Sequence, residues 1–183
     1  MLAFTIETER LLLRRIRMED YRWLFEKCSR QEAMNYLGIN TEEAYWARRK
    51  KYEGGMQTYR SRFEVFQLLH KDGLRVLGDC GYHTWFPDHC RAEIGYSLMQ
   101  ETDRRKGYMS EAIKEVLNYG FTVMNLNRVE ALIAPDNIAS LKVVESMGFK
   151  QEGTLREHYF TNNRFEDSVL YALLKSEFPK EIN

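Results

Sequence analysis

The stretch Arg104-Arg105-Lys106-Gly107-Tyr108-Met109-Ser110-Glu111-Ala112 lies between an alternating apolar run and an amphipathic helical pattern. Its glycine lets the backbone bend close to a ligand, the helix that follows has unpaired N–H groups in its first turn, and three cations add positive charge. The stretch therefore predicts a site for a pyrophosphate group. A basic turn with one glycine is also common on solvated surfaces, so a second segment is needed to decide between the two interpretations.

That second segment follows one predicted strand later, where Asn137-Ile138-Ala139-Ser140 precedes Glu145-Ser146-Met147-Gly148-Phe149. Together the two segments resemble the acyl-CoA-binding core of the GNAT acetyltransferase superfamily. In that family an Arg/Gln-x-x-Gly-x-Gly/Ala loop wraps the pyrophosphate of acetyl-CoA, and an Asn-x-x-Ala/Ser helix ending in Gly-Phe closes the site. The residues that match these patterns are Arg104, Gly107, Asn137, Ser140, Gly148 and Phe149. Met109 replaces the usual small residue of the loop, so its side chain is expected to point away from the phosphates.

Two further stretches narrow the resemblance. Ala92-Glu93-Ile94-Gly95-Tyr96 and Gly153-Thr154-Leu155-Arg156 are similar to the branch that contains the Rim-type N-terminal acetyltransferases of ribosomal proteins. The resemblance extends from about Thr8 to Phe178. It implies an enzyme that transfers the acetyl group of acetyl-CoA directly to a primary amine in a ternary complex, with a protein N-terminal α-amine as the expected acceptor.

Composition is consistent with this interpretation. A chain of 183 residues with 44% hydrophobic and 30% charged residues predicts one globular domain over residues 1–183. A formal net charge of +0 gives no global attraction to nucleic acid or membrane. The charged opening of the chain does not fit an ordinary signal peptide, and we expect a cytoplasmic protein. The three cysteines have no metal-ligand spacing, so neither a metal site nor a disulfide framework is expected.

The pattern of apolar residues predicts an α+β protein. Strands are expected at residues 11–16, 63–69, 75–86, 90–99, 128–134, 150–160 and 165–174, and helices at 19–28, 41–52, 109–124 and 137–147; no element is assigned to residues 31–40. This order matches the GNAT fold, a central mixed and mostly antiparallel sheet of about seven strands flanked by helices.

Local signals mark several boundaries and faces. Thr41 is a good N-cap, Gly148 is placed as a left-handed helix stop, and the asparagines of Thr161-Asn162-Asn163 suit a turn. Residues expected to face the core are Ile113, Val116, Leu117, Gly120 and Val123 on one helix, and Ile138, Leu141, Val144 and Met147 on the next.

The resemblance implies how acetyl-CoA is held. In the family the fourth and fifth strands splay apart, and the pantetheine arm inserts like an extra strand. Main-chain groups of Tyr96, Ser97, Leu98 and Met99 would then pair with the arm. The residues expected to receive the pyrophosphate are Arg104, Arg105, Lys106, Gly107, Tyr108, Met109 and Ser110, with Asn137 and Ser140 closing the site. An N–H near Tyr96 to Leu98 would stabilise the oxyanion, which is worth on the order of 3 kcal/mol.

Catalysis requires a neutral amine and a proton for the leaving thiolate. An α-amino group titrates near 8 and lysine near 10.4, so an α-amine needs less help with deprotonation, by roughly 3.5 kcal/mol. Glu93 matches the strand glutamate that serves as base in several GNAT enzymes, although an outward, solvated strand position is the alternative interpretation. Val144 stands where many relatives carry the tyrosine acid and cannot donate a proton. Ser140 is the substitute, since Rim-type relatives carry serine there.

Several possibilities stay open. Glu157, His158 or Tyr159 on the last hairpin could contact substrate or act as an auxiliary base, and Trp46, Tyr52 and Trp85 could wall the acceptor pocket or belong to the core. The run Arg48-Arg49-Lys50-Lys51 could bind an acidic partner or be a solvated helix face. A small-amine acetyltransferase acting on polyamines or antibiotics, and a non-catalytic acyl-CoA-binding module, are the rival functions. A homodimer is possible, because relatives are often dimers.

Overall fold

A computed structural model describes residues 4–55, 62–161 and 163–179, and within them the chain forms one mixed sheet of eight strands. The strands are β1 (Thr5–Glu7), β2 (Leu11–Ile16), β3 (Arg62–His70), β4 (Val76–Phe86), β5 (Arg91–Leu98), β6 (Arg128–Ile133), β7 (Lys150–Thr161) and β8 (Arg164–Leu174). Their order in the sheet is β1-β2-β3-β4-β5-β6-β8-β7. Only β5 and β6 pair in parallel, and the other neighbours are antiparallel.

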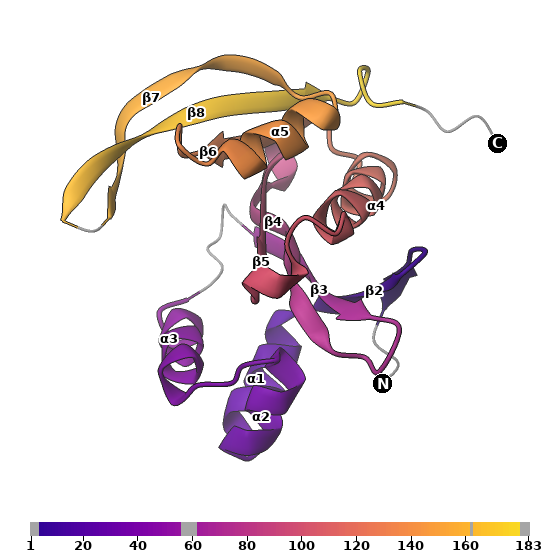
Figure 1. Cartoon of the computed structure of the whole chain (residues 1–183), viewed down its shortest axis with the longest axis vertical. Helices are drawn as coiled ribbons and strands as arrows, with labels where there is room; N and C mark the ends of the chain where they lie inside the picture. The colour runs from indigo at the N-terminus through magenta and orange to yellow at the C-terminus, as the bar shows by residue number, and fades with distance from the viewer. Residues whose placement is uncertain (1–3, 56–61, 162, 180–183) are drawn as a thin grey trace.

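Five α-helices accompany the sheet in the described residues. They are α1 (Met18–Glu26), α2 (Arg30–Leu37), α3 (Glu42–Glu53), α4 (Tyr108–Thr122) and α5 (Ile138–Ser146). None of these helices combines the length and apolarity that a bilayer-spanning segment needs. Figure 1 shows α1, α2 and α3 grouped at the lower end of the view, while the β7–β8 hairpin runs across the top.

The expected α+β architecture is confirmed, with two additions. The eighth strand is β1, whose three residues are too few to show an alternating pattern, and it pairs with β2 from Thr5↔Arg14 to Glu7↔Leu12. The unassigned residues 31–40 contain most of α2. Its start has a capping box, because the Ser29 side chain accepts from the Glu32 N–H and the Glu32 carboxylate accepts from the Ser29 N–H at 2.8 Å.

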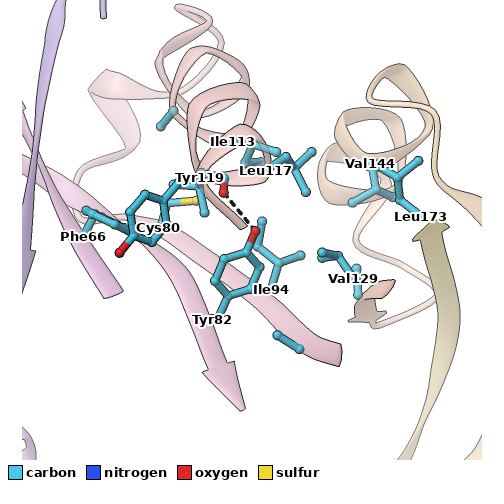
Figure 2. Packing of buried hydrophobic residues seen from close by; sticks show 14 of the residues in the cluster. Phe66, Cys80, Tyr82, Ile94, Ile113, Leu117, Tyr119, Val129, Val144 and Leu173 are labelled. Carbon is cyan, nitrogen blue, oxygen red and sulfur yellow. Dashed lines mark hydrogen bonds between the residues drawn. The ribbon is translucent and has the colours of Figure 1, made fainter. Parts of the chain in front are cut away.

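Helix α4 packs on the sheet through a core that Figure 2 shows in close-up. Tyr82 of β4 is fully buried and its hydroxyl donates to the Val116 carbonyl at 2.9 Å. Gly120 makes this approach possible, since a Cβ at that position would lie 2.0 Å from the Tyr82 hydroxyl. A glycine inside a helix costs about 1 kcal/mol against alanine, so its presence here reflects the close contact between helix and sheet.

Two residues expected in the core lie outside it. Val123 is 66% exposed because α4 ends at Thr122, one residue earlier. Ile138 is 55% exposed as the first residue of α5. The helical period placed the other predicted core residues correctly, and it missed the buried aromatic rings of Tyr119 and Phe121.

The end of α5 is as expected. Gly148 has φ 86°, the Phe149 N–H donates to the Val144 carbonyl at 3.1 Å and the Gly148 N–H to the Glu145 carbonyl at 3.0 Å. This is the Schellman arrangement, and it turns Phe149 into the core. In the β7–β8 turn, Asn163 has the expected positive φ of 61°, while Asn162 lies outside the described residues.

A separate group of buried residues belongs to the helices of the first half. Tyr21, Leu24 and Phe25 of α1 pack with Leu37 of α2 and Tyr45 of α3, against the end of β3. The main core instead joins β2–β6, α4 and α5. The described residues therefore form two separate apolar clusters, one with α4 and α5 and one with α1, α2 and α3.

Candidate active site

The strands β5 and β6 separate after a short stretch of pairing. Their register covers only Arg91↔Arg128, Ala92↔Val129 and Glu93↔Glu130, although β5 continues to Leu98. On its other side, β6 pairs with β8 along its whole length. The expected splay is therefore present, between the fourth and fifth strands of the expected order. It leaves the β5 backbone after Glu93 without strand partners on the β6 side.

A cavity of about 470 Å³ occupies the region next to the free part of β5. Its lining residues are Tyr96, Ser97, Leu98, Arg104, Arg105, Met109, Asn137, Ala139, Ser140 and Val143. Eight of these were predicted from the sequence to contact acetyl-CoA. They come from β5, from residues 104–107 before α4 (the cradle loop), from the first turn of α4 and from the start of α5. The predicted contacts Met99, Lys106, Gly107, Tyr108 and Ser110 do not line it.

The position of Met99 differs from the expectation for the pantetheine arm. Strand β5 ends at Leu98, and the Met99 N–H donates to the Leu77 carbonyl on the β4 side at 2.8 Å. That N–H is thus already engaged, which leaves Tyr96, Ser97 and Leu98 as the residues beside the cavity. Met109 lines the cavity and also packs against the main core.

The cradle loop has the backbone geometry of an anion site. Arg105 and Gly107 have φ of 60° and 82°, and Gly107 is the N-cap of α4. The first-turn N–H groups of this 15-residue helix therefore follow directly on the loop. Arg104 and Arg105 add their charges at the cavity wall. Such an arrangement fits a diphosphate, because two arginines precede the start of a helix whose first-turn N–H groups have no acceptor within the helix.

Two arginines, Arg10 and Arg75, hold the cradle loop in place, and no sequence pattern pointed to either of them. Arg10 donates to the Glu111 carboxylate at 2.8 Å and to the Lys106 carbonyl at 2.8 Å, and it lies over the Tyr108 ring. Arg75 forms two hydrogen bonds, of 2.7 and 2.8 Å, with Asp103, whose side chain is 2% exposed. Both pairs join residues distant in the chain.

Tyr96 and Ser140, which both line the cavity, carry hydroxyl groups. Tyr96 donates to the Ser140 carbonyl at 3.4 Å, which fixes its ring against the first turn of α5. Asn137 caps that helix, since its side chain accepts from the Ser140 N–H at 3.1 Å. Val144 is fully buried against Leu173 and its neighbours, so the position that carries the acid in many relatives contributes only packing here.

Glu93 lies on the same face of β5 as Ser97, because side chains alternate along a strand. Burial raises the pKa of Glu93 above its usual value, and the neighbouring Glu130 carboxylate raises this pKa further. His158, Thr84 and Arg91 oppose the shift. Glu93 is half-buried rather than solvated, but it lines neither the cofactor cavity nor the cavity described next.

A second cavity, of about 510 Å³, shares Tyr96 and Ser97 with the first. It is lined by Tyr21, Ala44, Ala47, Arg48, Lys51, Val65, Asp79, His83, Tyr96 and Ser97. Trp46, Tyr52 and Trp85, considered as possible walls, are absent from its lining. The two cavities therefore border the same two residues of β5.

His83 is a residue that the sequence analysis missed. Its imidazole lies so close over β5 that a Cβ on Gly95 would be 2.3 Å from its Cδ2 atom. Burial lowers the pKa of His83, which keeps the ring neutral at pH 7. An isolated histidine in a strand carries no sequence signal, and Gly95 pairs in register with Gly81 rather than with His83, so no sequence pattern links the two residues.

The last hairpin forms a hollow of its own. Glu157 and His158 line it, and His158 Nδ1 lies 3.1 Å from the Ser168 hydroxyl. The Glu157 N–H donates to Asp167 at 2.8 Å. Glu93 interacts electrostatically with both His158 and Tyr159, so the hairpin does approach the strand that carries the candidate base.

Comparisons with known proteins agree with this geometry. A family model described as an acetyltransferase (GNAT) domain matches residues 10–150. The uncharacterized N-acetyltransferase p20 of Bacillus licheniformis is 34% identical over 95% of this chain and 98% of its own length. A spermidine N(1)-acetyltransferase of Vibrio cholerae is 26% identical over 92% of this chain and 95% of its own. An acetyltransferase (GNAT family) structure from Bacillus anthracis is 30% identical with a TM-score of 0.67, covering 95% of this chain and 100% of that one.

Proposed function

We propose, from the premise that this chain belongs to the acetyltransferase (GNAT) domain family, that it acetylates a protein N-terminal α-amine of the ribosomal-protein type. Acetyl-CoA supplies the acetyl group in this family. The residues at the cofactor cavity suit acetyl-CoA chemically. Tyr96 lies on the unpaired edge of β5, and Arg104 and Arg105 of the cradle loop line the same cavity.

One observation carries the proposal. The splay of β5 and β6 opens beside a cavity lined by Arg104 and Arg105, and a second cavity is lined by Tyr96 and Ser97 of the same strand. A thioester tail has an amide-rich, extended shape that suits an unpaired strand edge. The second cavity then gives an amine access to the carbonyl carbon.

Each step of the transfer is assigned to different residues of the chain. Glu93 accepts the proton of the attacking amine, through water because it lies away from both cavities. A β5 N–H between Tyr96 and Leu98 donates to the carbonyl oxygen as negative charge develops on it. Ser140 relays a proton from solvent to the departing sulfur, so that its own hydroxyl is restored in the same step. Arg104 and Arg105 bind the diphosphate, and Asn137 fixes Ser140 by capping its helix.

A polyamine acceptor is the second candidate, because the spermidine acetyltransferase is similar along nearly the whole chain. The two candidates differ in the charge that the acceptor brings. An α-amine of a peptide brings at most one positive charge at the reacting end, whereas spermidine brings several.

The proposed function is tested by thiol release from acetyl-CoA with a panel of peptides, spermidine and small amines, next to calorimetry with coenzyme A. Turnover of peptides supports the proposal, and Glu93→Gln should reduce it by on the order of a hundredfold or more while leaving coenzyme binding intact. Tight coenzyme binding without turnover of any amine would identify a binding module instead. Turnover of spermidine but of no peptide would move the function to the polyamine class.

A further inference from the structure

The second cavity has an unusual charge for a site that must accept an amine. Arg48 and Lys51 of α3 line it, and Asp79 of β4 is its single carboxylate. His83 is neutral at pH 7 because burial lowers its pKa. The lining therefore carries one positive charge in excess, on the side from which the acceptor would approach Tyr96 and Ser97.

Asp79 is largely engaged within the cavity wall. It accepts from the Ser97 hydroxyl at 3.2 Å and lies 3.5 Å from the Arg48 guanidinium, at the limit of hydrogen bonding. Arg48 is also held by the hydroxyl of Tyr21, to which it donates at 3.1 Å. Asp79 thus orients Arg48 while neutralising it incompletely.

Lys51 is the free cation of this wall. Lys51 is exposed, and no ion pair joins it to another residue in the described part of the chain. Lys51 lies three residues after Arg48, so the two cations project from the same face of α3 toward the cavity. A fixed cation beside an unpaired one is an arrangement that suits an anionic group on a ligand.

We propose that this cavity selects amines that carry a carboxylate or other anionic group close to the reacting nitrogen, with Lys51 and Arg48 contacting that group. The inference rests on the proposed amine acetylation and deepens it. The acceptor is then a peptide with acidic side chains just after its N-terminal residue. A free amino acid offers the same anionic chemistry through its own carboxylate, and the test below separates the two sources.

The same charges disfavour a polyamine. Spermidine would bring further ammonium groups toward Lys51 and Arg48, with only Asp79 to receive them. Like charges a few ångströms apart repel even at the dielectric constant of water, and they repel more strongly in a partly enclosed cavity. This holds although a spermidine acetyltransferase is similar to the chain as a whole, since selectivity resides in individual side chains of the site.

The test uses the full chain and three peptides that differ only at positions two and three, with Asp-Glu, Asn-Gln or Lys-Lys after an N-terminal alanine. Free glutamate and spermidine complete the acceptor set. The rate constant kcat/KM is measured for wild type, Lys51→Gln and Lys51→Glu. Lys50→Gln is the matched control, because Lys50 is an exposed neighbour on α3 that does not line the cavity.

Wild type should prefer the acidic peptide to the neutral one by about tenfold, the effect of one charge in a partly screened cavity. Lys51→Gln should remove most of this preference, Lys51→Glu should reverse it in favour of the basic peptide, and Lys50→Gln should retain it. The preference should also weaken with added salt. If free glutamate is acetylated with the same kcat/KM as the acidic peptide, the site is assigned to free amino acids. If glutamate is not acetylated, the site is assigned to peptides.

Equal kcat/KM for the three peptides in wild type would overturn the inference while leaving amine acetylation standing. A preference that Lys51→Glu does not alter would overturn it as well. If no amine is turned over, the proposed function falls, and the inference is then decided by fluorescence anisotropy of the labelled peptides with coenzyme-saturated protein. In that case it stands only if the acidic peptide binds more tightly and Lys51→Glu abolishes the difference.

Discussion

Replacing Gly107 by alanine tests the idea that the cradle conformation serves anion binding. Gly107 has φ 82° as the N-cap of α4, a conformation that costs a non-glycine residue about 1–2 kcal/mol. The new methyl would also lie 3.3 Å from the Arg10 Nη2 atom. The loop can relax by moving away from Arg10, which loosens the hydrogen bonds of that guanidinium to Glu111 and to the Lys106 carbonyl.

Relaxation in the free protein has a defined consequence for binding. If the diphosphate requires the strained conformation, the 1–2 kcal/mol released by the free loop must be supplied again when coenzyme A binds. Since about 1.4 kcal/mol corresponds to tenfold, the Kd for coenzyme A should rise by about five- to thirtyfold. Isothermal titration calorimetry measures this change directly, and urea unfolding reports the stability of the same variant.

Gly148→Ala is the matched control. Gly148 has a similar φ of 86°, and an added Cβ would meet only Leu173 Cδ1 at the ordinary distance of 3.8 Å. It stops α5 and does not line the cofactor cavity. Both variants should lose about 1–2 kcal/mol of unfolding free energy or less, and only Gly107→Ala should lose affinity. A Kd for Gly107→Ala within twofold of that for Gly148→Ala would refute the assigned role of the cradle.

Three further predictions concern the core and the chemistry. Gly120→Ala should lower the unfolding free energy in urea by about 2–3 kcal/mol, because its methyl would collide with the Tyr82 hydroxyl, and Tyr82→Phe should recover part of the loss. If Glu93 is the base, kcat/KM should fall with decreasing pH below the raised pKa of Glu93; this acidic limb should vanish in Glu93→Gln and persist in His83→Gln. Ser140→Ala should lower kcat with little change in coenzyme Kd, and an unchanged kcat would transfer the acid role to another group, with the Tyr96 hydroxyl tested next by Tyr96→Phe.

Elements whose signals are local were predictable from the sequence. Gly148 and Phe149 ended α5 as expected, since a left-handed stop depends on residues next to one another. The splay was also foreseen, through the family resemblance. Strand β1 was missed because its three residues gain their structure only by pairing with β2. The start of α2 had a readable capping box in Ser29 and Glu32, so that omission was avoidable.

The long-range contacts that hold the site in place could not be predicted from sequence patterns. Arg10 and Glu111 are separated by 101 residues, and Arg75 and Asp103 by 28. A charged residue in a chain rich in charge gives no indication of its distant partner. The contacts are nevertheless decisive for geometry, because two guanidinium groups fix the loop that presents Arg104 and Arg105 to the cavity.

The basic run Arg48-Arg49-Lys50-Lys51 on α3 shows that residues adjacent in the sequence can have different surroundings in the fold. Its four consecutive cations look like one solvated face, yet the helix turns them in different directions. Arg49 pairs with Glu53 at 2.8 Å one turn along the same helix, whereas Arg48 and Lys51 face the second cavity. His83 can lie over β5 because Gly95 has no side chain. The neutral imidazole of His83 therefore lines the same cavity as the two cations. The charge of the acceptor site therefore follows from the helical period of α3 and from one glycine of β5, and an acceptor with a negative group is the one that this wall would stabilise.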